Sequence, residues 1–227
     1  MKLTRYGRRE LLLLSTAAGL VCAVVVVLAW ATWWWVVAFG SVPLVLWLWV
    51  VSFFRDPDRS PPPGDSLLSP ADGRVTDITP LDADSPLGCE GTRIGIFMSI
   101  FNVHVNRSPC DGTVQRVDYR KGAFLDARDP AAADRNESAS IFLRAGDDGP
   151  LLVVRQVAGL IARRIVTDVR VGERVSRGGR IGMIKFSSRL ELMVPKPMIK
   201  QVLVEIGQKV RAGETPLVQP AEGVENG

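Results

Sequence analysis

The sequence predicts a mainly β domain, built as a sandwich or barrel of short strands and preceded by a transmembrane helical hairpin. Three observations lead to this fold class. The run Leu11–Phe54 carries no formal charge, the chain beyond it alternates short apolar runs with Gly, Pro and Asp, and two pairs of segments repeat within that part. Short alternating runs with turn residues between them are typical of sandwiches and barrels. A chain of 227 residues has room for one such domain besides the apolar run.

The uncharged run suffices for two membrane spans, because crossing a ~30 Å hydrocarbon core takes about 20 helical residues. We place the spans at Leu11–Trp30 and Trp34–Phe54. The stretch "AFGSVP", with Gly40 and Pro43, suits a tight turn and predicts a break there. One long tilted span is the alternative. A cleaved signal peptide is disfavoured, because its apolar region is much shorter than this run.

Aromatic and basic residues predict the orientation of the hairpin. All six tryptophans lie in the run, as expected for side chains that prefer the membrane interface: Trp30, Trp33, Trp34, Trp35, Trp47 and Trp49. Residues 1–10 form a basic tail, and Arg55 and Arg59 follow the run. Basic flanks stay on the cytoplasmic side. We therefore expect a protein of the cell (inner) membrane whose β domain faces the cytoplasm.

The remaining composition does not support a nucleic-acid-binding or a metal-binding function. The net charge of +4 comes mostly from the first ten residues, so the soluble part is nearly neutral and does not predict a nucleic-acid partner. The three cysteines, Cys22, Cys89 and Cys110, lack the spacing of a metal site, and the chain has one histidine. We predict free thiols and no metal.

The part after the helices divides into three segments. "RDPDRSPPPGD", residues 55–65, predicts a stiff proline-rich linker. Residues 66–218 form the predicted β domain, with strands in "GRVTDI", "TRIGIFMSI", "GTVQRVDYR", "LLVVRQVAG", "RIGMIKF", "RLELMVP" and "KQVLVEI". The polar stretch Asp126–Ser140 predicts a mobile surface loop. Residues 219–227 are expected to form a flexible tail.

Two internal repeats support a compact β fold. "SPADGRV" (Ser69–Val75) recurs as "SPCDGTV" (Ser108–Val114), an Asp-Gly turn that enters a strand. "VGERVSRGGRIG" (Val171–Gly182) recurs as "IGQKVRAGETPL" (Ile206–Leu217). Such Gly-rich hairpins resemble the paired hairpins of lipoyl and biotinyl carrier domains.

Three places could carry chemistry, and each also has a purely structural interpretation. His104 is the only histidine and so the only side chain that ordinarily exchanges protons near neutrality, yet a lone histidine on an apolar strand is commonly just packed. Asp72 could be only the first residue of an Asp-Gly turn, like Asp111. The adjacent hydroxyls Ser187 and Ser188 could form a bend between two strands. From these residues alone the reaction stays open.

The order of six segments identifies a resemblance. "FFRDPDRSPP", "LLSPADGRV", "IGIFMSIFNVHVNRSP", "RQVAGLIARRIV", "GERVSRGGRIGMIKFSSRLELMVP" and "IGQKVRAGET" resemble the short, bacterial and archaeal type of phosphatidylserine decarboxylase. The resemblance implies a proenzyme that cuts itself between Ser187 and Ser188, leaving a β-chain 1–187 and an α-chain 188–227. Ser188 then becomes a covalent pyruvoyl group.

The resemblance also implies roles for the candidate residues. Asp72, His104 and Ser188 match the family's triad, in which His104 accepts the proton of the Ser188 hydroxyl and Asp72 orients and stabilises the imidazole. The mature enzyme forms a Schiff base with phosphatidylserine and releases CO2 and phosphatidylethanolamine. The implied partners are this phospholipid, the surrounding membrane lipid and the two cleaved chains, with a homodimer left open.

One departure keeps a second interpretation open. Ser187 stands where the family usually has glycine, which tolerates strained backbone angles better. The alternative is therefore an unprocessed, non-catalytic homologue that binds anionic phospholipid at the membrane. A carrier module is disfavoured, because it needs a lysine displayed in a Met-Lys-Met hairpin and the chain has none.

Overall fold

The computed structural model describes residues 8–29, 33–125, 135–146, 149–159, 164–185 and 188–221. The chain separates into two compact units, Met1–Pro57 and Asp58–Gly227. We describe each unit by itself.

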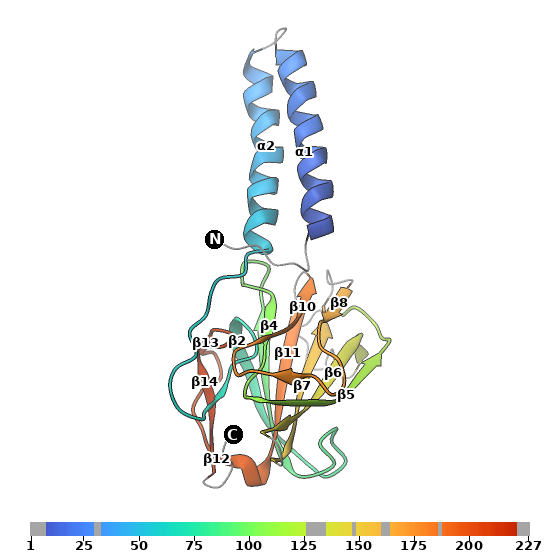
Figure 1. Cartoon of the computed structure of the whole chain (residues 1–227). Coiled ribbons are helices and arrows are strands. Elements are labelled where there is room, and N and C mark those ends of the chain that lie inside the picture. Colours follow the sequence, from blue (N-terminus) through green and yellow to red (C-terminus); the bar gives the residue numbers. More distant parts are fainter. Residues whose placement is uncertain are drawn as a thin grey trace. The chain divides into compact units, whose positions relative to one another are not determined.

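The first unit consists of two helices, α1 (Arg8–Ala29) and α2 (Trp33–Phe53) (Figure 1). They pack side by side, and the Trp47 indole nitrogen donates a hydrogen bond to Ser15 Oγ at 2.9 Å. Within α1, Arg9–Val27 has a mean hydropathy of 2.4 and is long and apolar enough to cross a membrane. The described apolar part of α2, Phe39–Phe53, is shorter.

The predicted break at "AFGSVP" is wrong, because α2 continues through Gly40 and Pro43. Helix α1 ends at Ala29 and α2 begins at Trp33. A Cβ atom at Gly40 would lie 3.2 Å from Val25 Cγ1, so Gly40 lets the two helices approach closely rather than turning the chain. Proline inside an apolar helix is tolerated where neighbouring groups satisfy the freed backbone carbonyl.

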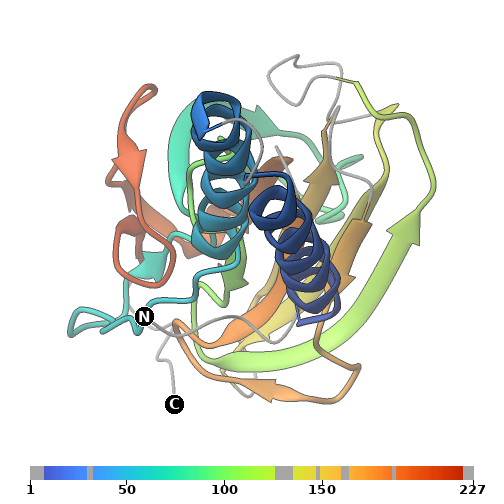
Figure 2. The same cartoon turned by 90° about the horizontal axis from the view of Figure 1, so that it is seen from above.

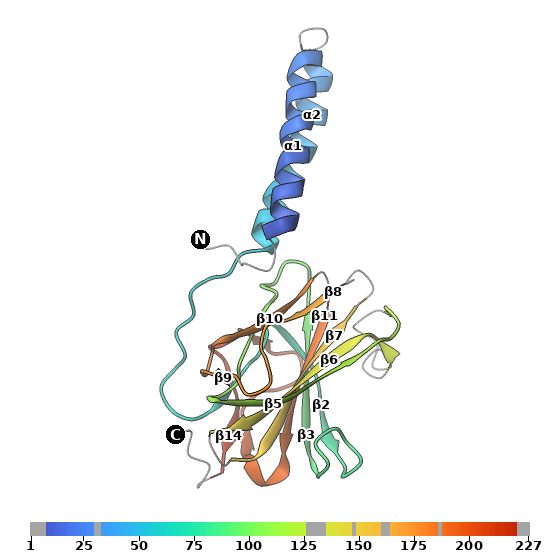
Figure 3. The same ribbon diagram turned by 45° about the vertical axis from the view of Figure 1, so that its right-hand side comes forward.

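The second unit is mainly β, as predicted, and its described strands form three sheets (Figures 1 and 3). The largest has eight strands in the order β13-β2-β3-β11-β7-β6-β5-β9, and the smaller ones have the orders β1-β14-β12 and β4-β10-β8. Figure 2 shows that the large sheet curls instead of lying flat. The strands are β1 (Leu67–Leu68), β2 (Gly73–Leu81), β3 (Gly91–Met98), β4 (Val105–Arg107), β5 (Gly112–Arg120), β6 (Ser138–Ala145), β7 (Leu151–Ala158), β8 (Arg164–Thr167), β9 (Arg174–Val175), β10 (Arg180–Lys185), β11 (Ser188–Pro195), β12 (Ile199–Val202), β13 (Lys209–Val210) and β14 (Pro216–Pro220).

Two segment boundaries differ from the expectation. The predicted loop Asp126–Ser140 is wrong at its end, because Ser138–Ser140 begin β6 and pair with β7. Their side chains are small and mostly polar, so this part of the strand shows no hydrophobic alternation in the sequence. Residues 126–134 lie outside the described residues. β14 reaches Pro220, inside the segment assigned to the tail, and residues 222–227 also lie outside the described residues.

One face of the large sheet carries the core. Alternate residues of its central strands are fully buried there, as the two-residue period of a strand requires. They include Ile94 and Ile96 of β3, Leu190 and Leu192 of β11, and Val154 of β7. Burying each such side chain contributes about 1.5–3 kcal/mol, so these strands are the stable frame on which the candidate site is built.

The internal repeats form equivalent structures in two halves of the large sheet. β13 pairs with β2 so that Val210 faces Gly73, and β9 pairs with β5 so that Val175 faces Gly112. The strand order is symmetric about the central pair β11 and β7. We call these the Asp72 half (β13-β2-β3-β11) and the Asp111 half (β7-β6-β5-β9).

The equivalence extends to the Asp-Gly turns. The Ala212 amide donates to Asp72 Oδ1 at 2.8 Å, and the Arg177 amide donates to Asp111 Oδ1 at 3.0 Å. Ala212 and Arg177 occupy the same place in the two repeated hairpins. The sequence repeat is therefore a structural repeat.

Candidate active site

Two of the three predicted catalytic residues lie at one end of the large sheet because of strand register. β2 and β11 both pair antiparallel with β3, so they run in the same direction. Arg74, Phe97 and Arg189 form one row across the three strands. Asp72 directly precedes β2 and Ser188 is the first residue of β11, so both lie just beyond this row on the same side.

The third predicted residue, His104, reaches the same end through a loop. β3 ends there at Met98, and the connection from β3 to β4 carries His104. The Asn102 side chain fixes this loop by accepting from the Ser99 amide at 2.9 Å and from its hydroxyl at 2.8 Å. Asp72, His104 and Ser188 thus come from three separate segments to one end of one sheet.

The imidazole of His104 is buried and has a defined donor position. Its Nδ1 lies 3.0 Å from the Asn102 carbonyl oxygen. A carbonyl only accepts, so the contact assigns the ring proton to Nδ1 and makes Nε2 the acceptor nitrogen of the neutral ring. The carbonyl of Asn102 therefore makes the orienting contact that a triad aspartate usually makes with Nδ1.

Ser188 is fully buried at the start of a strand whose residues are all buried. Its Oγ donates to Met98 Sδ at 3.5 Å, and its backbone is in register with Met98 on one side and Ala158 on the other. A pyruvoyl group in place of this residue has one heavy atom fewer, so the position has room for it. The other predicted scission residue, Ser187, lies outside the described residues.

Asp72 is held by two groups that sequence reasoning did not connect to it. Arg59 Nη2 donates to both of its oxygens, at 3.0 and 2.8 Å, and the Ala212 amide donates to Oδ1. The side chains of Arg59 and Asp72 are 8% and 12% exposed. Arg59 belongs to the proline-rich linker, where its charge predicted only membrane orientation.

A buried polar chain lies behind Ser188. Met98 Sδ accepts from Asn106 Nδ2 at 3.8 Å, Gln156 Nε2 donates to Asn106 Oδ1 at 2.8 Å, and Thr167 Oγ1 donates to Gln156 Oε1 at 2.9 Å. Satisfied buried networks of this kind hold side chains in one arrangement. Single polar residues inside apolar strands were the only sequence signal for it.

Asn136 adds a further buried contact at this end. Its Nδ2 donates to the carbonyl of Ala158 at 2.7 Å, and Ala158 is the strand partner of Ser188. Asn136 also bonds the backbone of Leu125 in both directions. It therefore ties the segment before β6 to the end of β7, beside the first residue of β11.

The opposite face of the central strands carries a buried ion network. Arg189, next to Ser188, donates to Glu191 Oε1 at 2.9 Å and to Asp77 Oδ1 at 2.8 Å. Burial alone would lower the pKa of Arg189, but Glu191 and Asp77 outweigh it, so its pKa is raised. Arg93 and Arg155 also lie within 4 Å of Glu191. This network fixes the strand that begins at Ser188.

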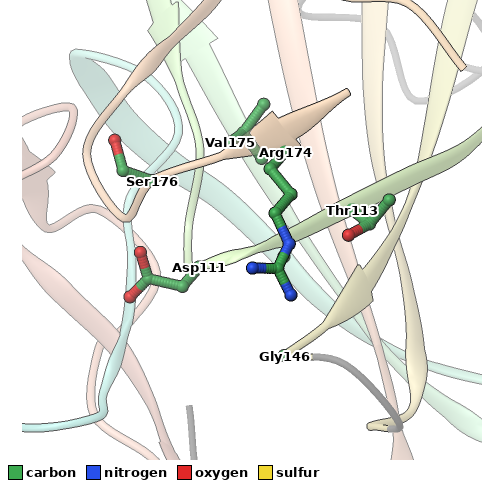
Figure 4. A pocket seen from close by; sticks show the side chains of 7 residues that line it. Asp111, Thr113, Gly146, Arg174, Val175 and Ser176 are labelled. Carbon is green, nitrogen blue, oxygen red and sulfur yellow. The ribbon is translucent and has the colours of Figure 1, made fainter. Parts of the chain in front are cut away.

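The described residues contain no group of three or more His, Cys, Asp and Glu side chains placed to hold a metal ion. A cavity of about 330 Å³ lies in the Asp111 half, and Ser188 is not among the residues that line it (Figure 4). It is lined by Asp111, Gly112, Thr113, Gly146, Arg174, Val175 and Ser176.

Comparison with known proteins identifies one family. Residues 46–218 match the model of the family described as phosphatidylserine decarboxylase. A phosphatidylserine decarboxylase proenzyme of Geobacter sulfurreducens is 47% identical over 175 residues, which cover 77% of this chain and 78% of the relative. The proenzyme of Trichlorobacter lovleyi is 45% identical over 180 residues, covering 79% and 80%. That of Syntrophus aciditrophicus is 45% identical over 177 residues, covering 78% and 82%.

Proposed function

Because this chain belongs to the phosphatidylserine decarboxylase family, we propose that it is a proenzyme that cuts its own backbone between Ser187 and Ser188 and then converts phosphatidylserine to phosphatidylethanolamine and CO2. The observation that supports this most is the convergence of Asp72, His104 and Ser188 at one end of the large sheet. A buried hydroxyl, one histidine and a carboxylate are the groups that self-cleavage requires.

In the first step, Ser188 Oγ attacks the carbonyl carbon of Ser187 and the amide becomes an ester. The hydroxyl is a weak nucleophile until a base takes its proton. His104 is that base through Nε2, because its Nδ1 proton is directed to Asn102. Asp72 contributes negative charge that stabilises the imidazolium.

The second step divides the backbone into two chains. Loss of the Cα proton of residue 188 breaks its Cβ–Oγ bond, so residue 187 leaves as a carboxylate and residue 188 becomes dehydroalanine. Water then replaces the amine as ammonia, and the α-chain begins with a pyruvoyl group. This route needs no oxidant, no metal and no second protein.

In the mature enzyme the pyruvoyl carbonyl supplies an electrophile for the substrate amine and an electron sink for loss of CO2. The residues of this chain position it. Strand β11 holds residue 188 between β3 and β7, and His104 supplies the proton that replaces the carboxylate. The buried network of Met98, Asn106 and Gln156 keeps this end of the sheet in one arrangement.

The organisation of the chain fits a lipid substrate. We infer a basic cytoplasmic tail at residues 1–10, a transmembrane hairpin within 11–54, a linker at 55–65 and a catalytic domain at 66–218 on the cytoplasmic face of the cell membrane. Tethering raises the effective concentration of the site near membrane lipid. The repeated hairpins of the domain resemble those of lipoyl-type carriers, a likeness of fold only.

Intact-mass measurement of the purified full-length chain tests the proposal. We expect a fragment 188–227 with a blocked amino terminus that reacts with hydrazines, together with fragment 1–187. Ser188→Ala is expected to give a single chain, and so is His104→Ala, because each removes a group without which the ester does not form. Two chains from Ser188→Ala would refute the assignment of the scission site.

Ser187 supports a second candidate function, a non-catalytic homologue that binds anionic phospholipid. A serine at the scissile bond loses the freedom of the glycine usual in the family. Uncleaved protein that binds phosphatidylserine vesicles without producing phosphatidylethanolamine would favour this candidate. If backbone strain limits the first step, Ser187→Gly shortens the half-time of cleavage severalfold; an unchanged half-time would rule strain out.

A further inference from the structure

Arg59 makes a buried, two-sided contact with Asp72. Its Nη2 lies 3.0 and 2.8 Å from the two carboxylate oxygens, and its Nη1 donates to Glu214 Oε2 at 3.0 Å. With the Arg59 side chain only 8% exposed, this is not a solvent-screened surface pair. Charge-assisted hydrogen bonds of this kind are short and directional, so they set the orientation of the carboxylate.

The linker that carries Arg59 is itself held on the β domain. A Cβ atom at Gly178 would lie 2.8 Å from Pro61 Cγ, so the linker packs closely against that hairpin turn. Arg177 donates from Nη1 to the Pro62 carbonyl at 2.6 Å and from Nε to the Ser66 carbonyl at 3.0 Å. Arg59 therefore approaches Asp72 from a segment that is fixed farther along the chain.

The contact joins segments on both sides of the proposed scission point. Arg59 and Asp72 precede Ser188, whereas Ala212 and Glu214 follow it. After cleavage, Arg59 and Asp72 would belong to the β-chain and their partners to the α-chain. The same contacts can thus hold Asp72 in one place before and after the backbone is cut.

The Asp111 half uses its arginine differently. Arg177 gives Asp111 the same backbone hydrogen bond that Ala212 gives Asp72, but its guanidinium donates to backbone carbonyls in and directly after the linker. The Arg59 side chain is 8% exposed, whereas Arg177 is only half-buried. Arg59, in contrast, donates hydrogen bonds to the Asp72 carboxylate, which takes part in the proposed chemistry.

We propose that Arg59 is a positioning residue for self-cleavage: it fixes the Asp72 carboxylate at the end of the sheet where Ser188 and His104 lie. The inference rests on the proposed function, because it assumes that Asp72 assists His104. Arg59 acts through Asp72 and touches no reacting atom. Removing it leaves the base in place but frees the carboxylate to rotate or to recruit water.

The test follows cleavage of the full-length chain synthesised in vitro in the presence of lipid nanodiscs, with fragment 188–227 measured by mass over time. Arg59→Gln is expected to slow cleavage about tenfold or more, and Arg59→Lys less, because lysine keeps the charge but cannot bind Asp72 and Glu214 through two separate nitrogens. Arg177→Gln is the matched control. It removes the guanidinium near the Asp111 turn and part of the linker's attachment but keeps the Arg59 guanidinium that binds Asp72, so its rate is expected to stay within about twofold of the parent.

A chemical rescue separates positioning from folding. Methylguanidinium added to Arg59→Ala is expected to restore part of the lost rate, and to have no effect on the parent or on Asp72→Asn. Parent-like cleavage by Arg59→Gln would overturn the inference. The inference would also be overturned if methylguanidinium did not restore cleavage of Arg59→Ala and if the cleavage rates of the Arg59 variants decreased in proportion to their melting temperatures.

Failure of this inference differs from failure of the proposed function. If Asp72→Asn blocks cleavage while Arg59→Gln cleaves normally, Asp72 acts without Arg59 and only the inference fails. If Asp72→Asn itself cleaves normally, the role proposed for Asp72 fails and the Arg59 contact is structural.

Discussion

The Asp72 half and the Asp111 half have the same backbone arrangement but differ in the chemistry they can perform. Both have an Asp-Gly turn, a backbone amide on the first carboxylate oxygen and a Gly-rich hairpin beside the strand. In the Asp72 half the central strand β11 begins with the buried Ser188. At the corresponding end of the Asp111 half, β7 follows Pro150, which has no nucleophile. The repeated fold supplies the frame, and side chains at the strand starts decide which half can react.

One cavity lies in the Asp111 half. It lies at the Asp-Gly turn that mirrors the Asp72 site, between Asp111 and Arg174 (Figure 4). A larger cavity of about 490 Å³ lies in the Asp72 half, at the opposite end of β2 and β3 from Asp72, where Pro80, Leu81, Gly91 and Thr92 are among its lining residues. Cavity volume therefore does not distinguish the halves. The buried hydroxyl, the histidine loop and the linker arginine favour the Asp72 half, and the predictions below compare the two halves.

The largest expected difference concerns the two aspartates. Asp72→Asn is expected to slow self-cleavage about 100-fold, since loss of a group that supports general-base catalysis commonly costs that much. Asp111→Asn is expected to cleave at nearly the parent rate. Fragment 188–227 appearing over time, measured by mass, gives both rates. Equal slowing in the two variants would remove the functional distinction between the halves, and slowing by Asp111→Asn alone would reverse it.

Sequence reasoning could find the halves because their repeats include backbone-determining residues. The Asp-Gly turns and the glycines of the hairpins are visible as letters, and the alternation of β5 and β11 follows from their apolar pattern. It could not find the partner of Asp72. Arg59 is close in sequence, but its contact depends on the path of the linker, and a charged residue after an apolar run is most simply explained by the membrane.

Other parts were missed for different physical reasons. β6 starts with Ser138, Ala139 and Ser140, whose strand structure comes from pairing with β7 rather than from hydrophobicity. Pro43 led to the prediction of a helix break because helices of soluble proteins seldom contain proline, whereas an apolar helix tolerates it. Long-range contacts decided these elements: β6 pairs with β7, and Gly40 of α2 packs against Val25 of α1. Neither contact appears in a local pattern.

A smaller effect tests whether the halves are equally stable. Val75 and Val114 occupy equivalent strand positions, and each is 1% exposed in the same core. Val75→Ala and Val114→Ala should each lower the free energy of unfolding by about 2 kcal/mol, through lost apolar burial and the cavity left behind. The measurement uses an uncleavable Ser188→Ala chain, so that unfolding involves one polypeptide.

Far-ultraviolet circular dichroism in a denaturant titration is the suitable probe. All six tryptophans precede the β domain, so their fluorescence does not report directly on its unfolding. Agreement of the two variants within about 1 kcal/mol is expected from their equal burial. A much larger loss for one of them would show that the repeat is equivalent in geometry but not in energy.

The smallest effect comes from the residue before each aspartate, which is Ala71 in one half and Cys110 in the other. Burial, with a further contribution from Asp111 and against the opposing effect of Arg177, raises the pKa of Cys110 from its ordinary value of 9.0 to about 12. As the pH rises, the Cys110 thiol therefore loses its proton at a lower pH in the unfolded chain than in the folded chain. Stability that is fully present below pH 9 is lost as the pH rises toward 12.

We expect the uncleavable chain to lose up to about 1.4 kcal/mol per pH unit above pH 9 relative to its Cys110→Ala version. The other two cysteines, Cys22 and Cys89, are present in both chains, so their titration cancels in the difference. Alanine at this position is already tolerated in the Asp72 half, where Ala71 is fully buried. Parallel stability curves for the two chains between pH 8 and pH 10 would mean that Cys110 ionises as readily in the folded as in the unfolded state, and that its surroundings admit water where those of Ala71 do not.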